Sequence, residues 1–151
     1  HTDHTQTPIG EIGLDLHPKW SSTVDHQRYV LTYFLDLATQ IQRPVILHVV
    51  RAHHEILRLL RSHPLAKVYL HGFRGNRALV QHYLKYDVFF GFSVLNSRLH
   101  YRELADVIPP ERVLLESDGL LSLSEFQDLC QHEYYSSLVA IHHANFSQFC
   151  Q

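Results

Sequence analysis

The sequence predicts an α/β fold built around a parallel β-sheet. Short apolar runs alternate along the chain with segments of helical periodicity, and most of the runs are apolar on both faces. Strands that are apolar on both faces are typical of parallel sheets covered by helices. The alternation of strand with helix is typical of βαβ units. With 151 residues, 45% of them hydrophobic, the chain is large enough for one domain with its own core.

Five runs have the length and composition of strands. They are rich in Val, Ile, Leu and Phe and cover Ile9–Leu14, Pro44–Val49, Lys67–Leu70, Val88–Phe92 and Val113–Leu115. A complete (β/α)₈ barrel needs eight strands and about 250 residues. The prediction is therefore either an open α/β sheet or the later part of a TIM-type barrel, with about five parallel strands and flanking helices.

The segments between the runs have the spacing of amphipathic helices. The first predicted helix turns Val30, Tyr33, Phe34, Leu37, Ala38 and Ile41 inward, and the second turns Ile56, Leu57, Leu59 and Leu60 inward. The third follows Asn76, a good N-cap, and carries Leu79, Val80, Tyr83 and Leu84. We expect a fourth at about Arg98–Val107, before two prolines, and a short one at Glu125–Leu129. A last helix from about Tyr134 to Cys150 would turn Leu138, Ile141, Phe146 and Phe149 inward.

Composition limits the function and the setting. The net charge of −2 excludes binding of nucleic acid by a strongly basic surface alone. Cys130 and Cys150 form no CxxC pair, which favours a reducing, cytoplasmic setting. No apolar run has membrane-spanning length, and no signal-peptide pattern opens the chain.

We expect His1–Thr7 to be a polar lead-in and residues 8–151 to form a single domain. The absence of methionine, at position 1 as elsewhere, suggests a processed or partial chain.

Acidic and histidine side chains stand in or just after four of the predicted strands. Glu11 lies inside the first run, and His48, His71 and Asp118 follow the second, third and fifth. The carboxyl ends of parallel strands emerge on one face, so these side chains should converge there. Carboxylates and imidazoles together suit a divalent metal. The pattern predicts metal-assisted hydrolysis, in which a carboxylate accepts a proton from water.

Each of these residues also has an ordinary structural interpretation. His48 and His71 can pack or cap at strand ends, and Asp118 can cap a helix or form a turn. Glu11 is harder to explain in this way, because a charged residue inside an apolar parallel strand is costly unless it is paired or metal-bound. The joint occurrence of all four favours the metal interpretation.

The order of the motifs resembles the TatD family of metal-dependent hydrolases. IGEIGLD, PVILH, HGFRG and LLESD follow one another between about Pro8 and Leu121. They are similar to the family's GEIGLD, PVxxH, HxFSG and ETD motifs. Gln27 in the first helix also matches, and the closing segment with Asn145 and Phe149 is similar to the family's NxxxLF helix. The resemblance implies a TIM-barrel deoxyribonuclease that uses divalent metals, either Mg²⁺, Mn²⁺ or Zn²⁺, to cleave DNA ends or other phosphoesters.

The resemblance also implies a role for each matching residue. Glu11 would be a metal-bridging carboxylate, and His48 and His71 the imidazole ligands of one metal. Asp118 would bind the other metal and act catalytically by orienting or deprotonating the attacking water. Two further matches, Asp15 and His53, correspond to positions beside the metal or the substrate.

The chain departs from the family pattern in several places. The family begins with an HxH pair on a first strand, and His1 and His4 have the wrong spacing to replace it. Three strands of a barrel therefore have no counterpart here, and the number of metals is left at one or two. Arg51 lies next to the position where the family often has a basic residue and can partly replace that charge. Arg74 replaces a serine and is either a phosphate contact or a surface residue. With Asp15 and His53, both are candidates for positions beside the metal or the substrate. After Asp118 the sequence GLLSLSEF alters the substrate-side loop.

Two alternatives follow from these departures. One is a catalytically impaired relative that works as a scaffold or a binding protein. The other is a hydrolase of the wider amidohydrolase type, acting on a C–N or lactone bond, which the GEIGLD and HGFRG motifs disfavour. A five-stranded piece also leaves unpaired edges, which predicts self-association unless another segment covers them.

Overall fold

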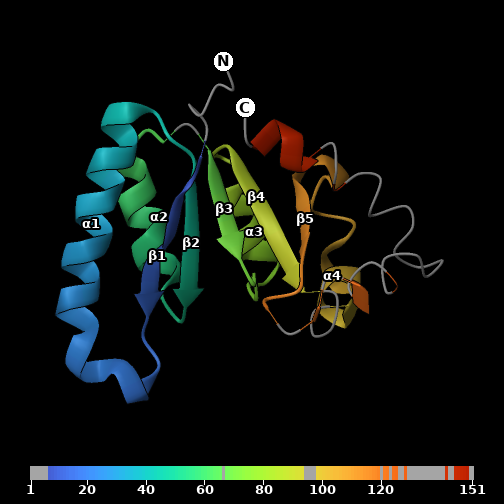
Figure 1. Cartoon of the computed structure of the whole chain (residues 1–151), viewed down its shortest axis with the longest axis horizontal. Helices are drawn as coiled ribbons and strands as arrows, with labels where there is room; N and C mark the ends of the chain where they lie inside the picture. The colour runs from blue at the N-terminus through green and yellow to red at the C-terminus, as the bar shows by residue number, and fades with distance from the viewer. Residues whose placement is uncertain are drawn as a thin grey trace.

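A parallel five-stranded sheet is the centre of the molecule (Figure 1). The computed structural model describes residues 7–65, 67–93, 98–119, 121–122, 124–125, 128, 142 and 145–149. In chain order the elements are β1 (Ile9–Asp15), the 3₁₀ helix η2 (Pro18–Thr23), α1 (Val24–Ile41), β2 (Val45–Val50), α2 (His53–Ser62), β3 (Val68–His71), α3 (Arg77–Tyr83), β4 (Val88–Ser93), α4 (Arg98–Leu104), the 3₁₀ helix η3 (Pro110–Arg112) and β5 (Val113–Glu116). The expected lead-in lies almost wholly outside the described residues.

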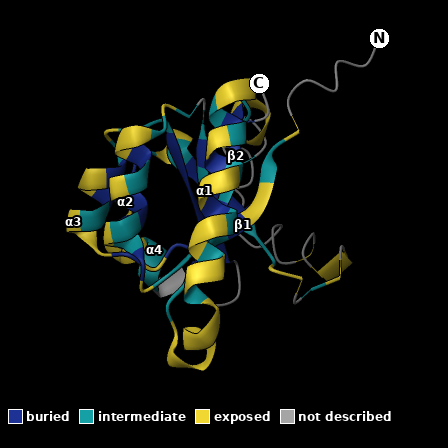
Figure 2. Cartoon of the chain, turned by 90° about the vertical axis from the view of Figure 1, so that its left-hand side faces the viewer, coloured by how far each residue is buried: buried dark blue, intermediate teal, exposed yellow. Residues whose placement is uncertain are grey.

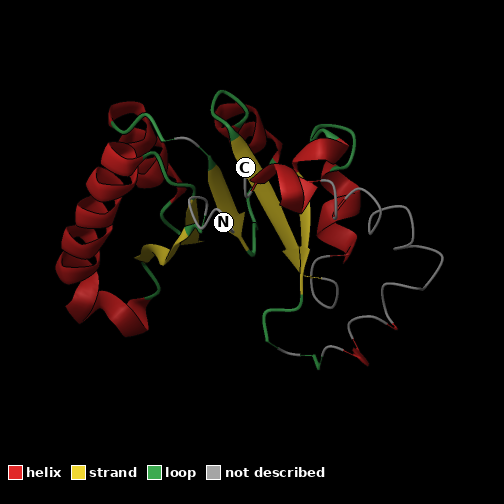
Figure 3. Cartoon of the chain, turned by 45° about the horizontal axis from the view of Figure 1, so that its top comes forward, coloured by secondary structure: helices red, strands yellow, loops and turns green. Residues whose placement is uncertain are grey.

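The strands lie side by side in the order in which they follow one another along the chain, β1-β2-β3-β4-β5. Helices α1, α2 and α3 make the connections up to β4 (Figure 3). A doubly wound sheet would reverse its strand order at a switch point, and no reversal occurs here. Sequential parallel strands with helical connections are the arrangement of a barrel wall. The predicted fold class, a partial TIM-type barrel, is confirmed.

The two faces of the sheet bury different sets of residues. Alternate strand residues, among them Val45, Leu47, Val68 and Leu70, pack in the main core with residues of the helices. The opposite face carries a smaller cluster of Phe89, Leu114 and Phe149, with Ile46 and Tyr69 packed against it. In β2 and β3 the buried residues alternate with partly exposed ones, and Val49 and Val50 are also partly exposed, so these strands are not buried on both faces as the sequence suggested. Only β4 is buried along its whole length.

The strands run slightly further than the apolar runs predicted. Their last residues are Asp15, Val50, His71, Ser93 and Glu116. Four of these five residues are polar, and all lie at the carboxyl edge of the sheet. The predicted strands ended too early, because they were defined by apolar residues alone. Pairing between the strands continues into the polar residues at that edge.

The inward face of α1 agrees only in part with the prediction. Ala38 is buried and Phe34 packs against the core, as predicted. Leu31 and Leu35 are buried although they were not predicted to be, whereas Tyr33 and Ile41 are exposed. Apolar residues occur all around this helix, and Leu31, Leu35 and Ala38 also have i, i+4, i+7 spacing. Gln27 precedes them by one turn on the same face and hydrogen-bonds to the backbone of Asp15, so this contact agrees with the observed rotation.

Helices cover the face of the sheet that carries the main core. Figure 2 shows α2 and α3 side by side, with their outer surfaces exposed. As predicted, Asn76 caps α3, because its side chain accepts a hydrogen bond from the Leu79 N–H. The fourth predicted helix exists but ends earlier, at Leu104, where a turn begins. None of the helices in the described residues combines the length and hydropathy needed to span a bilayer.

Most of the predicted last helix, and most of the segment predicted as a short helix at 125–129, lie outside the described residues. Residues 145–149 are helical and lie beside the amino ends of β4 and β5 (Figures 1 and 3). Asn145 is buried and donates to the carbonyl oxygens of Pro110 and Val113, at 2.8 Å each. Phe149 is buried on the same helical face, but Phe146 is 53% exposed, so its predicted inward position is wrong. A residue one position after Asn145 is turned away from that face.

Candidate metal centre

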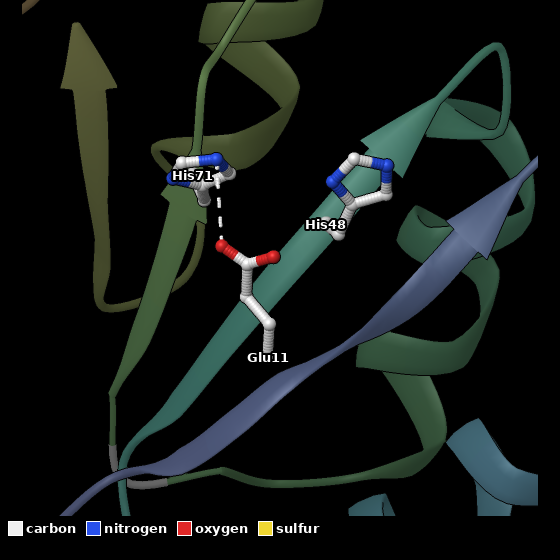
Figure 4. Close-up of side chains that lie close together, drawn as sticks. All are labelled: Glu11, His48 and His71. Atoms are coloured by element: carbon white, nitrogen blue, oxygen red, sulfur yellow. Dashed lines mark ion pairs between the residues drawn. The ribbon is translucent and has the colours of Figure 1, made fainter. Parts of the chain in front are cut away.

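Three of the four predicted ligands meet at the carboxyl edge of β1, β2 and β3. His48 and His71 are register partners on neighbouring strands, and Glu11 reaches toward them from β1 (Figure 4). One ligand atom of each residue lies within 4.8 Å of the others. The two imidazole rings stack with their centroids 6.3 Å apart. The structure therefore brings Glu11, His48 and His71 into one group.

His71 is surrounded by carboxylates. Its Nε2 atom lies 3.4 Å from Glu11 Oε1 and 3.3 Å from Asp118 Oδ1, and its Nδ1 atom lies 2.9 Å from Glu116 Oε2. The hydrogen bond to Glu116 is the largest cause that raises the pKa of His71, to about 9, and the charges of Glu11 and Asp118 raise it further. Burial acts in the opposite direction. The carboxylates thus favour a positive charge at this point.

Both carboxylate oxygens of Glu116, the last residue of β5, accept hydrogen bonds. Oε1 accepts from the Gly72 N–H at 2.8 Å, and Oε2 accepts from the Tyr69 hydroxyl as well as from His71. Burial, followed by the negative charge of Glu116, raises the pKa of Tyr69 well above its ordinary value, so the hydroxyl stays a donor. Gly91 lies beside this pair, and a Cβ there would overlap Tyr69 Oη and Glu116 Oε2, so these side chains would have to shift.

Sequence reasoning missed Glu116 and Tyr69. A usable signal was present for Glu116, because it is a charged residue directly after the apolar residues Val113–Leu115. The same argument singled out Glu11, since a carboxylate in an apolar strand needs a partner. Tyr69 gave no such signal, because tyrosine is common in strands.

Asp118 follows β5 in a turn and has a positive φ of 55°. Its side chain is 58% exposed, and its carboxylate points at the same His71 nitrogen as Glu11 does. Aspartate tolerates this left-handed conformation better than most residues. Asp118 is therefore at the edge of the group, in contact with solvent, which suits a group that exchanges protons with water.

Asp15 lies on the other side of His48. Its Oδ2 atom is 3.9 Å from His48 Nε2, and its Oδ1 atom accepts from the His17 N–H at 2.9 Å. Gln27 of α1 accepts from the Asp15 N–H at 2.8 Å and so connects the first helix to the end of β1. Asp15 thus lies beside the candidate ligand His48.

A pocket of about 470 Å³ opens over the group and includes the remaining predicted residues. Arg51, Arg74 and His53 line it together with His48, His71, Glu116 and Asp118. Arg51 and Arg74 are exposed and have no ion pair among the described residues. His53 is fixed differently: its Nδ1 atom is 3.0 Å from the Tyr83 hydroxyl, and burial, followed by the charge of His54, lowers its pKa.

The donor set suits a divalent metal ion. Two imidazoles and one carboxylate are a ligand set of metallohydrolases, in which further positions are filled by water or substrate. Glu116 occupies the Nδ1 side of His71 and leaves Nε2 facing Glu11. A carboxylate behind a ligating histidine orients the ring and increases its basicity. These contacts fit a metal on the Nε2 side of His71.

Comparison with known proteins found one matching family and many relatives. The family model described as TatD related DNase matches residues 2–140. A protein named 3'-5' ssDNA/RNA exonuclease TatD from Klebsiella pneumoniae strain 342 is 39% identical over 117 residues, 74% of this chain. A human protein named 3'-5' RNA nuclease TATDN2 is 29% identical over 135 residues, 83% of this chain. This chain spans 44% of the length of the first relative and 18% of the second.

Solved structures have the same fold. The TatD homologue YjjV from Escherichia coli K12 superposes with a TM-score of 0.75 at 24% identity, over 95% of this chain and 63% of that protein. A TatD family hydrolase from Entamoeba histolytica superposes with a TM-score of 0.58 at 21% identity, over 72% of this chain and 38% of that protein. These likenesses support the barrel-type architecture of the five strands.

Proposed function

Since this chain belongs to the TatD-related DNase family, we propose that it forms the metal-binding part of a hydrolase that cleaves phosphoester bonds in single-stranded nucleic acid. The observation that carries the proposal is the convergence of Glu11, His48 and His71 from three adjacent strands, with ligand atoms within 4.8 Å. The names of the relatives as exonucleases of DNA and RNA support the choice of substrate.

The proposed ion would be held by Glu11, His48 and His71. When bound, it would polarise the phosphoryl group and lower the pKa of a water molecule. Two imidazoles favour Zn²⁺ over Mn²⁺ and Mg²⁺, which prefer oxygen ligands. A second ion would have Glu11 and Asp118 as its ligands among the described residues, so we propose one tightly held ion per chain.

The other residues would act on water and on substrate. Asp118 is the proposed catalytic base, because its exposed carboxylate faces the pocket and can accept a proton from attacking water. Arg51 and Arg74 would bind the phosphate, since both are pocket cations without an acidic partner among the described residues. Asp15 and Glu116 would orient the two histidines, and His53 would form part of the pocket wall.

Metal content and nuclease activity, measured on the same preparations, test this function. We expect the whole chain to bind a divalent metal and to hydrolyse single-stranded DNA, with Glu11→Gln weakening metal binding. Asp118→Asn should bind the metal but lower kcat by about 10²–10⁴-fold, the usual contribution of a general base.

Glu103→Gln and Asp36→Asn are matched controls, because both residues are exposed and lie on helices away from the pocket. The proposal is wrong if the chain binds no metal, or if Asp118→Asn is as active as Asp36→Asn. Activity on a cyclic amide or lactone with none on phosphoesters would also contradict it.

The extent of the functional unit is part of the proposal. We treat residues 8–151 as one domain, because residues 145–149 pack on β4 and β5 of the same sheet. The outer edges of β1 and β5 have no strand partner among the described residues. Such edges pair readily, so self-association through them is proposed, together with the cytoplasmic setting expected from the sequence.

A further inference from the structure

Helices α2 and α3 contact each other on the outer side of the sheet (Figure 2). A pocket of about 220 Å³ lies along them, separate from the pocket over the metal ligands, and no residue lines both. Its lining residues are His54, Leu57, Arg61, His82, Lys85 and Tyr86. We call this pocket the α2–α3 groove. Its two cationic side chains and two imidazoles are all exposed.

The cations of the groove are not neutralised within the described part of the chain. No acidic residue lines the groove, and neither Arg61 nor Lys85 forms an ion pair there. By contrast, Arg28, Arg58, Arg77 and Arg112 each pair with an aspartate or a glutamate. In a chain of net charge −2, the unpaired cations of Arg61 on α2 and of Lys85 in the turn after α3 form a local positive patch that can attract an anion.

The groove begins next to the pocket over the metal ligands. His53 lines that pocket and His54, its neighbour at the start of α2, lines the groove. Arg61 is about two turns further along the same helix, or about 10 Å by the helical rise. Arg51 and Arg74 add unpaired cations at the pocket itself. A chain of phosphates that leaves the pocket past His54 would therefore meet Arg61 and Lys85 next.

We propose that the α2–α3 groove binds the phosphates of a single-stranded nucleic acid whose end occupies the metal site. This inference rests on the proposed function, because one strand must reach both places. Arg61 and Lys85 contact the phosphates, while the partly exposed Tyr86 provides aromatic surface for a base.

Strand binding is measured on the whole chain with metal removed by a chelator, so that no cleavage occurs. The probes are a labelled dinucleotide and a labelled single strand of about 12 nucleotides, within the usual range of single-strand site sizes. The test variant is Arg61→Glu/Lys85→Glu. The control variant, Lys19→Glu/Arg102→Glu, makes the same change in net charge at exposed residues that do not line the groove.

We expect the test variant to bind the longer strand about tenfold or more weakly, and the control variant to bind it like the wild type. The plot of log K against log salt concentration has a negative slope, and the test variant should make this slope less steep by about 1.4. The reason is that two phosphate contacts, worth about 0.7 each, are lost. The dinucleotide should bind equally to all three proteins, since it is too short to reach the groove.

An unchanged affinity or salt slope in the test variant, or an equal loss in the control, would overturn the inference. So would tight binding of polyglutamate that depends on Arg61 and Lys85 in the same way, because the groove would then fit an acidic protein. Hydrolysis of a short phosphodiester by the same proteins separates the two proposals. If the wild type hydrolyses nothing but binds the longer strand through Arg61 and Lys85, the proposed function fails and the groove assignment stands.

Discussion

At the scale of single residues, Glu116 orients the His71 ring and raises its pKa. The carboxylate accepts hydrogen bonds from Tyr69, from the Gly72 N–H and from His71, and it is only 10% exposed. Because Glu116 is itself held by the Tyr69 hydroxyl and the Gly72 N–H, it fixes the orientation of the His71 ring, whose far nitrogen faces Glu11. The proposed ligand His71 therefore depends on a residue that does not itself face the proposed metal.

Replacement of Glu116 by glutamine should change how stability depends on pH in the metal-free protein. His71 has a pKa of about 9 when folded and about 6.5 when unfolded. The folded state therefore binds more protons between these values, and the stability that His71 contributes below pH 6.5 is lost as the pH rises through 9. Glu116→Gln should flatten this dependence, because the largest cause of the raised pKa is removed. Thermal unfolding against pH, with chelator present, measures it.

A second measurement on the same variant concerns metal affinity. We expect Glu116→Gln to bind the metal about 10–100-fold more weakly, the usual effect of losing the partner of a ligating histidine. Glu103→Gln, at an exposed position on α4, should match the wild type in both measurements. An unchanged pH dependence together with unchanged metal affinity would show that Glu116 has no effect on His71.

At the scale of elements, the site depends on how closely β3, β4 and β5 approach one another. Tyr69 of β3 reaches past Gly91 of β4 to contact Glu116 of β5. This contact between side chains of non-adjacent strands is possible only because the residue between them has no side chain. The glycine provides space here and not a special backbone conformation, since its φ is not in the left-handed region.

Substitution of Gly91 by alanine should therefore damage both stability and the site. We expect a loss of about 1–3 kcal/mol, as for other insertions of a methyl group into a packed interior, together with weaker metal binding. Chemical denaturation and a metal titration measure the two effects. Tyr69→Phe removes one of the overlapping atoms, so Gly91→Ala should cost less in the Tyr69→Phe background. Equal costs in the two backgrounds would contradict the overlap with Tyr69.

At the scale of the whole molecule, residues 145–149 pack on the sheet face that carries the smaller cluster of Phe89 and Leu114. Phe149 is 1% exposed, and its ring centroid lies 5.5 Å from that of Phe89 and 5.8 Å from that of Tyr69. Asn145 connects the same helix to the start of β5 through two buried hydrogen bonds. These contacts join parts of the chain that are distant in sequence into one core at the opposite end of the strands from the site.

Truncation of Phe149 should destabilise the chain strongly. We expect Phe149→Ala to lower the free energy of unfolding by about 3–5 kcal/mol, the usual cost of removing a buried phenylalanine. Phe146→Ala, on the same helix but 53% exposed, should change it by about 0.5 kcal/mol or less. Denaturant unfolding of both variants measures the difference. Similar losses for the two phenylalanines would contradict the packing of residues 145–149.

The sequence by itself determined the parallel strands, most of the helices and the four residues that converge at the carboxyl edge. These features are local, because apolar periodicity marks each element and strand ends of a parallel sheet share one edge. The structure brings Glu11, His48, His71 and Asp118 together as expected, while their roles in metal binding and catalysis stay predictions.

Only the tertiary structure decided which side chains support the candidate ligands and which face α1 buries. Tyr69 and Glu116 are 47 residues apart, and their contact depends on the register of three strands. The rotation of α1 was ambiguous, because apolar residues surround that helix and more than one face fits the periodicity. The α2–α3 groove likewise arises only when two helices pack side by side. The physical reason is common to all three: each depends on the relative placement of elements, which local sequence patterns do not contain.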